Sequence, residues 1–283
     1  NIVSTKLGGF IMGKLTTVNG KSNVVLDKFD SFGDMLAYAN ANTNKQQSDK
    51  GDRSFTETAN YAEAHNLAVE GWHAVRPEVE RIMSQLSEQI DSRLDMVSEL
   101  EYATSGGAVD VGRWLTGEPE CMYSFVPMPN ERMGRVVKIF IDYGASASFS
   151  AEFIRQRGIV LCALVDTLQK MRIACEVWGE TAVTFGNKIH TTVVKLHDAT
   201  AQMDIDELMF ALANPSMLRR ITFSVRELAG CGNNHSYGAT IHTEYAVDYG
   251  ADIRIERLKQ SYGTMMENPV EWVVSTIKGM ELI

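Results

Sequence analysis

The segment after residue 135 constrains the fold most, because runs of distinct pattern follow one another there. Residues 136–142 are mostly β-branched or aromatic and end in an acid, which is typical of a buried strand. Residues 152–171 carry apolar side chains at helical spacing, and residues 173–179 form a second β-rich run. A strand, a helix and a strand in this order predict a βαβ unit whose two strands are parallel.

The same alternation continues to the end of the chain. The further predicted elements are strands at 191–196, 221–225 and 251–255 and helices at 204–213 and 269–278. The first of these helices is stopped by Asn214 and Pro215, since proline cannot continue a helix. We therefore expect residues 135–283 to form an α/β domain, a mostly parallel sheet with flanking helices in three layers.

Residues 1–134 have a different pattern and form a predicted N-terminal hairpin and helical region. Asn19-Gly20 lies between two β-rich runs and indicates a tight turn, hence an edge hairpin. The alternative for this segment is a flexible arm that docks on a neighbouring subunit. Helices are predicted at 31–38, 58–71 and 76–97, and the polar segment 40–53 is predicted to be an exposed, mobile loop. Residues 101–135 are the predicted joint between the two parts of the chain, with a short helix at 109–115 packed by Trp114.

The first strand–loop–helix unit resembles the von Willebrand factor A domain over residues 135–230. That family binds a divalent metal through an Asp-x-Ser-x-Ser loop, and this chain has Asp142-Tyr143-Gly144-Ala145-Ser146. The first Asp and the last Ser match, whereas Gly144 replaces the middle Ser. Two oxygen ligands alone do not hold Mg²⁺, and further ligands would have to come from residues such as Asp198, Thr200 or Glu227. The other interpretation of the Asp142–Ser146 loop is a degenerate site in which Asp142 caps the following helix.

A second resemblance covers nearly the whole chain. Residues 112–122 and 206–220 are similar to signatures of an uncharacterised tailed-phage protein family. This resemblance implies a phage origin and no particular reaction.

Charge and cysteine content limit the classes of partner and compartment. The chain has 27 basic and 36 acidic residues, a net charge of −9, which disfavours a protein that coats nucleic acid by charge alone. The four cysteines form no Cys-x-x-Cys pair and are expected to be reduced structural thiols. No run is long and apolar enough for a membrane span. We expect a soluble protein of the host cytoplasm or the virion, without membrane partners.

No complete catalytic motif is present. Histidines at metal-ligand spacing, phosphate-binding glycine loops and a Gly-x-Ser-x-Gly nucleophile turn are all missing from the sequence. His197 and Asp198 are adjacent on a predicted strand, so their side chains should point to opposite faces. We therefore assign no catalytic, cofactor-binding or metal-binding residue and expect no cofactor.

Three functions stay open at this point. The leading one is a non-enzymatic phage interaction or assembly protein, a homo-oligomer with a phage or host protein partner. The alternative is a single-stranded-DNA-binding cofactor of a phage RNA polymerase, and an enzyme of unrecognised type is the third. The residues available for single-stranded DNA are the basic run 130–135, Arg254, Arg257 and the tyrosines Tyr237, Tyr245, Tyr249 and Tyr262.

Overall fold

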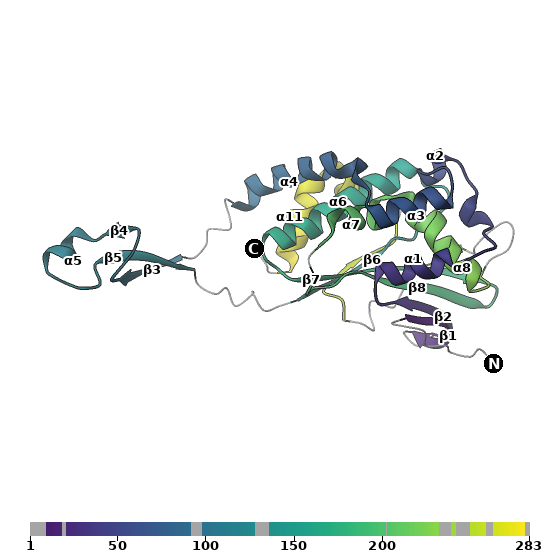
Figure 1. Cartoon of the computed structure of the whole chain (residues 1–283), viewed down its shortest axis with the longest axis horizontal. Coiled ribbons are helices and arrows are strands. Elements are labelled where there is room, and N and C mark those ends of the chain that lie inside the picture. Colours follow the sequence, from purple (N-terminus) through teal and green to yellow (C-terminus); the bar gives the residue numbers. More distant parts are fainter. Residues whose placement is uncertain are drawn as a thin grey trace.

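A seven-stranded sheet forms the centre of the computed structural model (Figure 1). The structure describes residues 10–18, 21–91, 98–127, 136–201, 203–231, 239–241, 250–258 and 263–280. The strand order is β1-β2-β8-β7-β6-β10, and β9 pairs with β7 beside this path. The strands are β1 (Phe10–Val18), β2 (Lys21–Phe29), β6 (Val137–Asp142), β7 (Cys175–Phe185), β8 (Lys188–His197), β9 (Ala239–Ile241) and β10 (Ile253–Ile255).

The predicted βαβ unit is confirmed. β6 and β7 are parallel, with Ile139 opposite Val177, and α6 (Ala151–Lys170) connects them. β10 is parallel to β6 on its other side, and β8 is parallel to β2. The predicted α/β class, a mostly parallel central sheet with flanking helices, is confirmed, although the β7–β8 and β1–β2 hairpins and β9 add antiparallel pairs.

The N-terminal hairpin belongs to this sheet. β1 and β2 pair antiparallel as predicted, and the turn residues Asn19 and Gly20 lie outside the described residues. β2 pairs with β8, so Asp27 stands opposite Thr192. The predicted segments 1–134 and 135–283 therefore share one sheet and one continuous hydrophobic core.

The helices pack on one side of the sheet. Figure 1 shows them above the strands, and the main core joins their inner faces to that face of the sheet. The expected third layer is therefore not found among the described elements, and the opposite face holds a smaller apolar cluster that includes Phe140 and Trp178. The helices are α1 (Phe32–Asn40), α2 (Arg53–Thr56), α3 (Tyr61–Glu70), α4 (Arg76–Asp91), α6, α7 (Ile205–Ala213), α8 (Phe223–Leu228), α10 (Gly263–Glu267) and α11 (Pro269–Gly279), with short 3₁₀ turns at Gln47–Asp49 and His73–Val75.

Most helix predictions are confirmed, including the Ser31 cap of α1, whose hydroxyl accepts the Asp34 N–H at 3.1 Å. Residues 92–97 of the predicted long helix lie outside the described residues. No helix in the described part of the chain is both long and apolar enough to cross a membrane.

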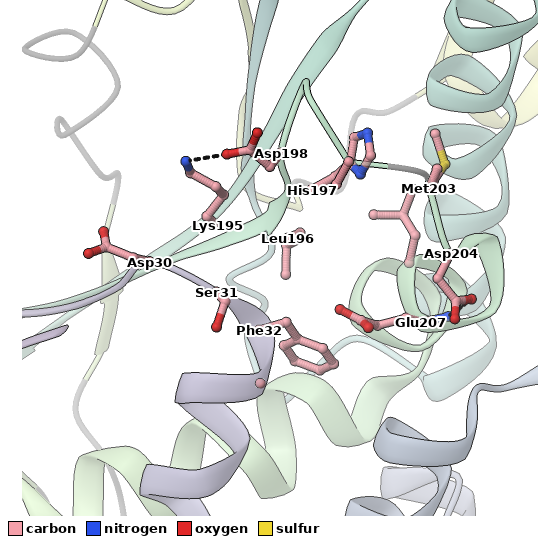
Figure 2. Close-up of a pocket in the computed structure, with 13 residues that line it drawn as sticks. Asp30, Ser31, Phe32, Lys195, Leu196, His197, Asp198, Met203, Asp204 and Glu207 are labelled. Carbon is pink, nitrogen blue, oxygen red and sulfur yellow. Dashed lines mark hydrogen bonds and ion pairs between the residues drawn. The ribbon is translucent and has the colours of Figure 1, made fainter. Parts of the chain in front are cut away.

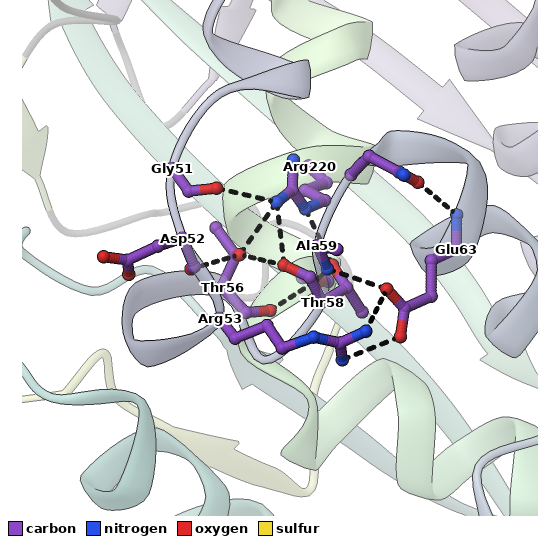
Figure 3. A network of polar contacts seen from close by, with 10 residues as sticks. Gly51, Asp52, Arg53, Thr56, Thr58, Ala59, Glu63 and Arg220 are labelled. Atoms are coloured by element: carbon purple, nitrogen blue, oxygen red, sulfur yellow. Dashed lines mark hydrogen bonds and ion pairs between the residues drawn. The ribbon is translucent and has the colours of Figure 1, made fainter.

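The polar segment 40–53 is largely exposed, as predicted, but it is anchored to the body at two buried residues. Asn42 and Ser48 are buried, and the Glu227 carboxylate accepts hydrogen bonds from Asn42 Nδ2 (2.6 Å), Ser48 N (2.9 Å) and Ser48 Oγ (2.7 Å). Arg220 is fully buried and donates to groups on both sides of α2 (Figure 3). Polar contacts, rather than apolar side chains, therefore hold this segment in place.

The strand predicted at 221–225 is wrong. A π-helix (Met217–Thr222) runs directly into α8, and its side chains Arg219 and Arg220 are buried. The β-branched residues of this segment favour a strand locally, but its tertiary contacts are made by a helix.

A second, three-stranded sheet lies apart from the α/β body in Figure 1. It consists of β3 (Ser98–Ala103), β4 (Ala108–Val109) and β5 (Met122–Pro127) in the order β3-β5-β4, with α5 (Val111–Leu115) after β4. We call residues 98–127 the projecting unit. The predicted short helix is confirmed as α5, but Trp114 does not pack it, because 61% of that side chain is exposed.

Candidate functional site

The Asp142–Ser146 loop lies at the carboxyl end of β6, where ligands of α/β sheets commonly bind. Asp142 is buried, and its Oδ1 accepts the Gly144 N–H at 2.9 Å. A Cβ at Gly144 would lie 2.8 Å from Asp142 Oδ1 and 2.9 Å from Thr181 Oγ1. Gly144 is therefore needed for close packing, and a serine there would displace its neighbours.

Asp142 does not cap the following helix, so that interpretation is wrong. Ser150 is the N-cap of α6, and its hydroxyl accepts the Phe153 N–H at 3.1 Å. Arg226 Nη2 donates to Thr181 Oγ1 at 3.2 Å, so a guanidinium group reaches the hydroxyl that borders Gly144. Arg226 therefore places a positive charge near the position where the resembled family binds a metal ion.

The three residues considered as further metal ligands are engaged in other contacts. Asp198 accepts from Lys195 Nζ at 2.8 Å and from Thr200 Oγ1 at 2.7 Å, and Glu227 binds residues 42–48. Within the described ranges, no group of three or more His, Cys, Asp and Glu side chains is arranged to hold a metal ion.

A cleft of about 310 Å³ lies between the start of α1, the end of β8 and the start of α7 (Figure 2). Phe32, Leu196 and Leu208 contribute apolar walls, whereas His197 and Glu207 contribute polar groups. The N-termini of α1 and α7 are already capped by Ser31 and by Asp204, which accepts from Asp206 N at 3.0 Å. These caps occupy the amides that would otherwise attract an anion.

The cleft does not assemble an acid–base pair from His197 and Asp198. The two side chains point in different directions, Asp198 towards Lys195 and His197 towards Met203 (Figure 2). Burial lowers the pKa of His197, whereas its hydrogen bond with Lys195 holds the pKa of Asp198 well below the usual range. Burial raises the pKa of Glu207, and the neighbouring charge of Asp204 adds to this. A neutral imidazole and an isolated carboxyl group give this cleft no evident nucleophilic chemistry.

The residues considered for single-stranded DNA are only partly described. Arg254 is exposed on β10, whereas Arg257 donates through Nη1 to the Thr240 hydroxyl at 3.2 Å. The basic run 130–135 and the four tyrosines lie outside the described residues. Of these candidates, only Arg254 and Arg257 are described.

The projecting unit carries the apolar surface that the sequence did not reveal. The exposed fractions are 72% for Leu115, 62% for Val111, 61% for Trp114 and 45% for Val109. None of the side chains described in this unit, residues 102–123, is buried. Residues 102–123 therefore contribute no buried core to this small sheet.

The unit is nevertheless held in one conformation by polar contacts. The hydroxyls of Tyr102 and Tyr123 donate to Asp110 Oδ2 at 3.1 and 2.9 Å, and the guanidinium of Arg113 lies 3.7 Å from the centre of the Tyr102 ring. Asp110 also caps α5, accepting from Arg113 N at 3.1 Å. A Cβ at Gly106 would lie 2.1 Å from the Tyr123 carbonyl oxygen, so only glycine fits at this turn.

The fold and these sites define a class, an α/β protein with a mixed sheet and a small projecting β unit. The chain belongs to a family described as a domain of unknown function (DUF7192), whose family model matches residues 11–277. The match includes the α/β body and the projecting unit. No curated protein and no solved structure matches the chain.

The cysteines are all free thiols. Cys162, Cys175 and Cys231 are buried, and burial raises the pKa of Cys175 to about 11. Cys121, in the projecting unit, is partly exposed. The prediction of reduced structural thiols fits the three buried residues.

Proposed function

We propose that this protein is a non-enzymatic interaction protein, of phage origin as its resemblance implies, which binds a protein partner through the projecting unit. The α/β body, a degenerate von Willebrand A-like module in this proposal, serves as the scaffold. The single observation that supports it most is the group of exposed apolar side chains on β4 and α5, of which Trp114 and Leu115 are the largest.

Exposed apolar side chains that are contiguous in a small unit are typical of a binding surface. Tryptophan contributes more than most residues to the stability of protein interfaces. The contacts of Asp110 with Tyr102, Tyr123 and α5 fix the surface before binding, which lowers the entropy lost on association. Burial of the surface by a partner would also supply the apolar contacts that the unit lacks.

The proposal is tested with a double variant, Trp114→Ser with Leu115→Ser, and a matched control, Val69→Ser. Val69 is a comparably exposed apolar residue, 64% exposed on α3 of the body. A partner identified by affinity capture and then purified should bind the wild-type chain and the control equally. The double variant should lose at least about 2 kcal/mol of binding free energy, about 30-fold in Kd, with an unchanged melting temperature.

The same proteins distinguish the proposal from the single-stranded-DNA alternative. A labelled oligonucleotide is titrated at two salt concentrations, with fluorescence anisotropy as the readout. The cofactor function would replace our proposal if the oligonucleotide bound tightly and more weakly at the higher salt concentration. That binding would also have to be lost in the Arg254→Ala with Arg257→Ala variant but kept in the Trp114 and Leu115 double variant.

A further inference from the structure

Resting on the proposed function, we infer that the partner presents a basic amphipathic segment, an apolar face flanked by Lys or Arg, to the projecting unit. The inference comes from the charge of the unit. Residues 98–127 contain five acids, Glu99, Glu101, Asp110, Glu118 and Glu120, against the single base Arg113, which gives a net charge of −4.

The single base is engaged within the unit, and its charge is already included in the net charge of −4. Arg113 Nε lies 3.0 Å from Glu118 Oε2, and its guanidinium stacks on Tyr102. Hydrogen bonds from the Arg113 N–H and the Tyr123 hydroxyl lower the pKa of Asp110, so this carboxylate stays ionised at neutral pH. Among the described side chains of the unit, the exposed apolar residues are therefore accompanied by the carboxylates of Asp110, Glu118 and Glu120.

The acids lie next to the apolar side chains because the chain turns tightly after α5. Gly117 N donates to the Trp114 carbonyl at 3.1 Å, and Glu118 N donates to the Arg113 carbonyl at 3.0 Å. Gly117 makes this turn at a φ of 79°. The turn brings Glu118 back against the helix that carries Trp114, and Glu120 follows it as a second exposed carboxylate.

A second copy of the same unit is a poor partner for this surface. Two units would each bring a net charge of −4, and the remaining residues of a second chain would add −5. Like charges repel over about 10 Å at 0.1 M salt, and a desolvated interface makes the repulsion larger. A homo-oligomer, which the sequence led us to expect, would have to use another surface. Anionic lipid and nucleic acid are disfavoured for the same reason.

The experiment uses the full chain and three peptides of equal length as probes. One peptide is an amphipathic helix of Leu and Lys, the second replaces Lys by Glu, and the third replaces Leu by Ser. Cys121 is the partly exposed cysteine of the projecting unit, so it takes an environment-sensitive fluorophore that reports binding there. We expect the Leu/Lys peptide to bind at least tenfold more tightly than either of the others.

Two double variants test the charge requirement. Glu118→Gln with Glu120→Gln should weaken binding of the Leu/Lys peptide about three- to tenfold, because exposed charge pairs contribute modestly. Glu80→Gln with Glu88→Gln removes the same charge from exposed positions on α4 and should leave binding unchanged. Raising the salt concentration should remove most of the difference between the two double variants.

The outcomes separate this inference from the proposed function. Equal binding of the Leu/Lys and Leu/Glu peptides, both lost in the Trp114 and Leu115 double variant, overturns the basic partner and leaves the proposed function standing. Light scattering that shows a dimer lost in the same variant also overturns the inference, in favour of a second copy. Peptide binding that is unaffected by the Trp114 and Leu115 substitutions overturns both.

Discussion

Replacing Arg220 by methionine should destabilise the protein strongly without changing the projecting unit. Arg220 is fully buried within the π-helix and is the centre of the polar contacts drawn in Figure 3. The five N–H groups of its guanidinium are shared among six acceptors, Thr58 Oγ1 (2.7 Å), Thr56 Oγ1 (2.9 Å), Thr58 O (2.9 Å), Gly51 O (3.1 Å), Ser48 O (3.2 Å) and Lys50 O (3.4 Å). Methionine has a similar length and offers no donor, so these acceptors lose their partner.

The magnitude follows from the four carbonyls among these acceptors. A buried acceptor without a donor costs about 1–3 kcal/mol, but parts of segment 48–58 are exposed and regain water. Several acceptors lose their donor at once, so we expect Arg220→Met to cost about 3–5 kcal/mol. That is a large share of the roughly 5–15 kcal/mol by which proteins of this kind are stable. Burial lowers the pKa of Arg220, which shows that the interior is already unfavourable for its charge.

Urea unfolding followed by circular dichroism measures the free energy of unfolding. Arg53→Met is the matched control, since Arg53 is 62% exposed and pairs with Glu63 at 2.8 Å within the same view. It should cost less than about 1 kcal/mol. If Arg220→Met were as stable as Arg53→Met, the polar contacts would not be what holds segment 40–59 against the body, and our account of that segment would be wrong.

Three further results are expected. Gly158→Ala should destabilise the protein by about 3 kcal/mol, because the added Cβ would lie 2.2 Å from Ala213 Cα on α7. Gly279→Ala is the control, since its Cβ would meet nothing within 4 Å, and it should be neutral or slightly stabilising. Equal melting temperatures of the two variants would contradict the close packing of α6 on α7. Glu207→Gln should be more stable than wild type at pH 7 and equally stable below pH 4. The pKa of Glu207 is raised above the ordinary 4.5, so the wild type loses stability as the pH rises and this carboxyl group ionises. Identical stability profiles of the two proteins against pH would refute this. EDTA should leave the melting temperature unchanged, and a Mg²⁺-dependent stabilisation abolished by Asp142→Ala would instead establish a metal site at the Asp142–Ser146 loop.

The sequence predicted the elements whose pattern is local. The runs that became β6, α6 and β7 each show the spacing of apolar residues that a buried strand or helix requires, and Ser31 marks the start of α1. These features depend on residues close in the chain, so a single sequence is enough to read them.

The errors arose where distant polar contacts decide the structure. Segment 40–53 lacks large apolar residues, and its attachment to the body depends on Glu227 and Arg220, which are far away in the chain. Residues 221–225 have a strand-like composition, yet they continue the helix that places Arg220 under α2. No local spacing reveals either arrangement.

The candidate site was missed for a related reason. Trp114 was expected to pack α5, because an apolar side chain in a short helix is usually covered. Its exposure depends on the projecting unit having no layer over it, which is a property of the whole arrangement rather than of any motif. The sequence Gly117-Glu118-Pro119-Glu120 was a weak signal of an exposed turn.

The parallel pairing of β2 with β8 has a consequence for how the chain acquires its structure during synthesis. Val24 stands opposite Ile189, so β2 finds this neighbour in the sheet only after 165 further residues have been made. Contacts between such distant segments slow folding, because a long loop must close before they form. Until then, the inner edge of the β1–β2 hairpin has unpaired backbone groups that can pair wrongly with other chains. We expect the sheet to form only after β8 has been made, and nascent chains that stop before residue 197 to depend on chaperones for their solubility.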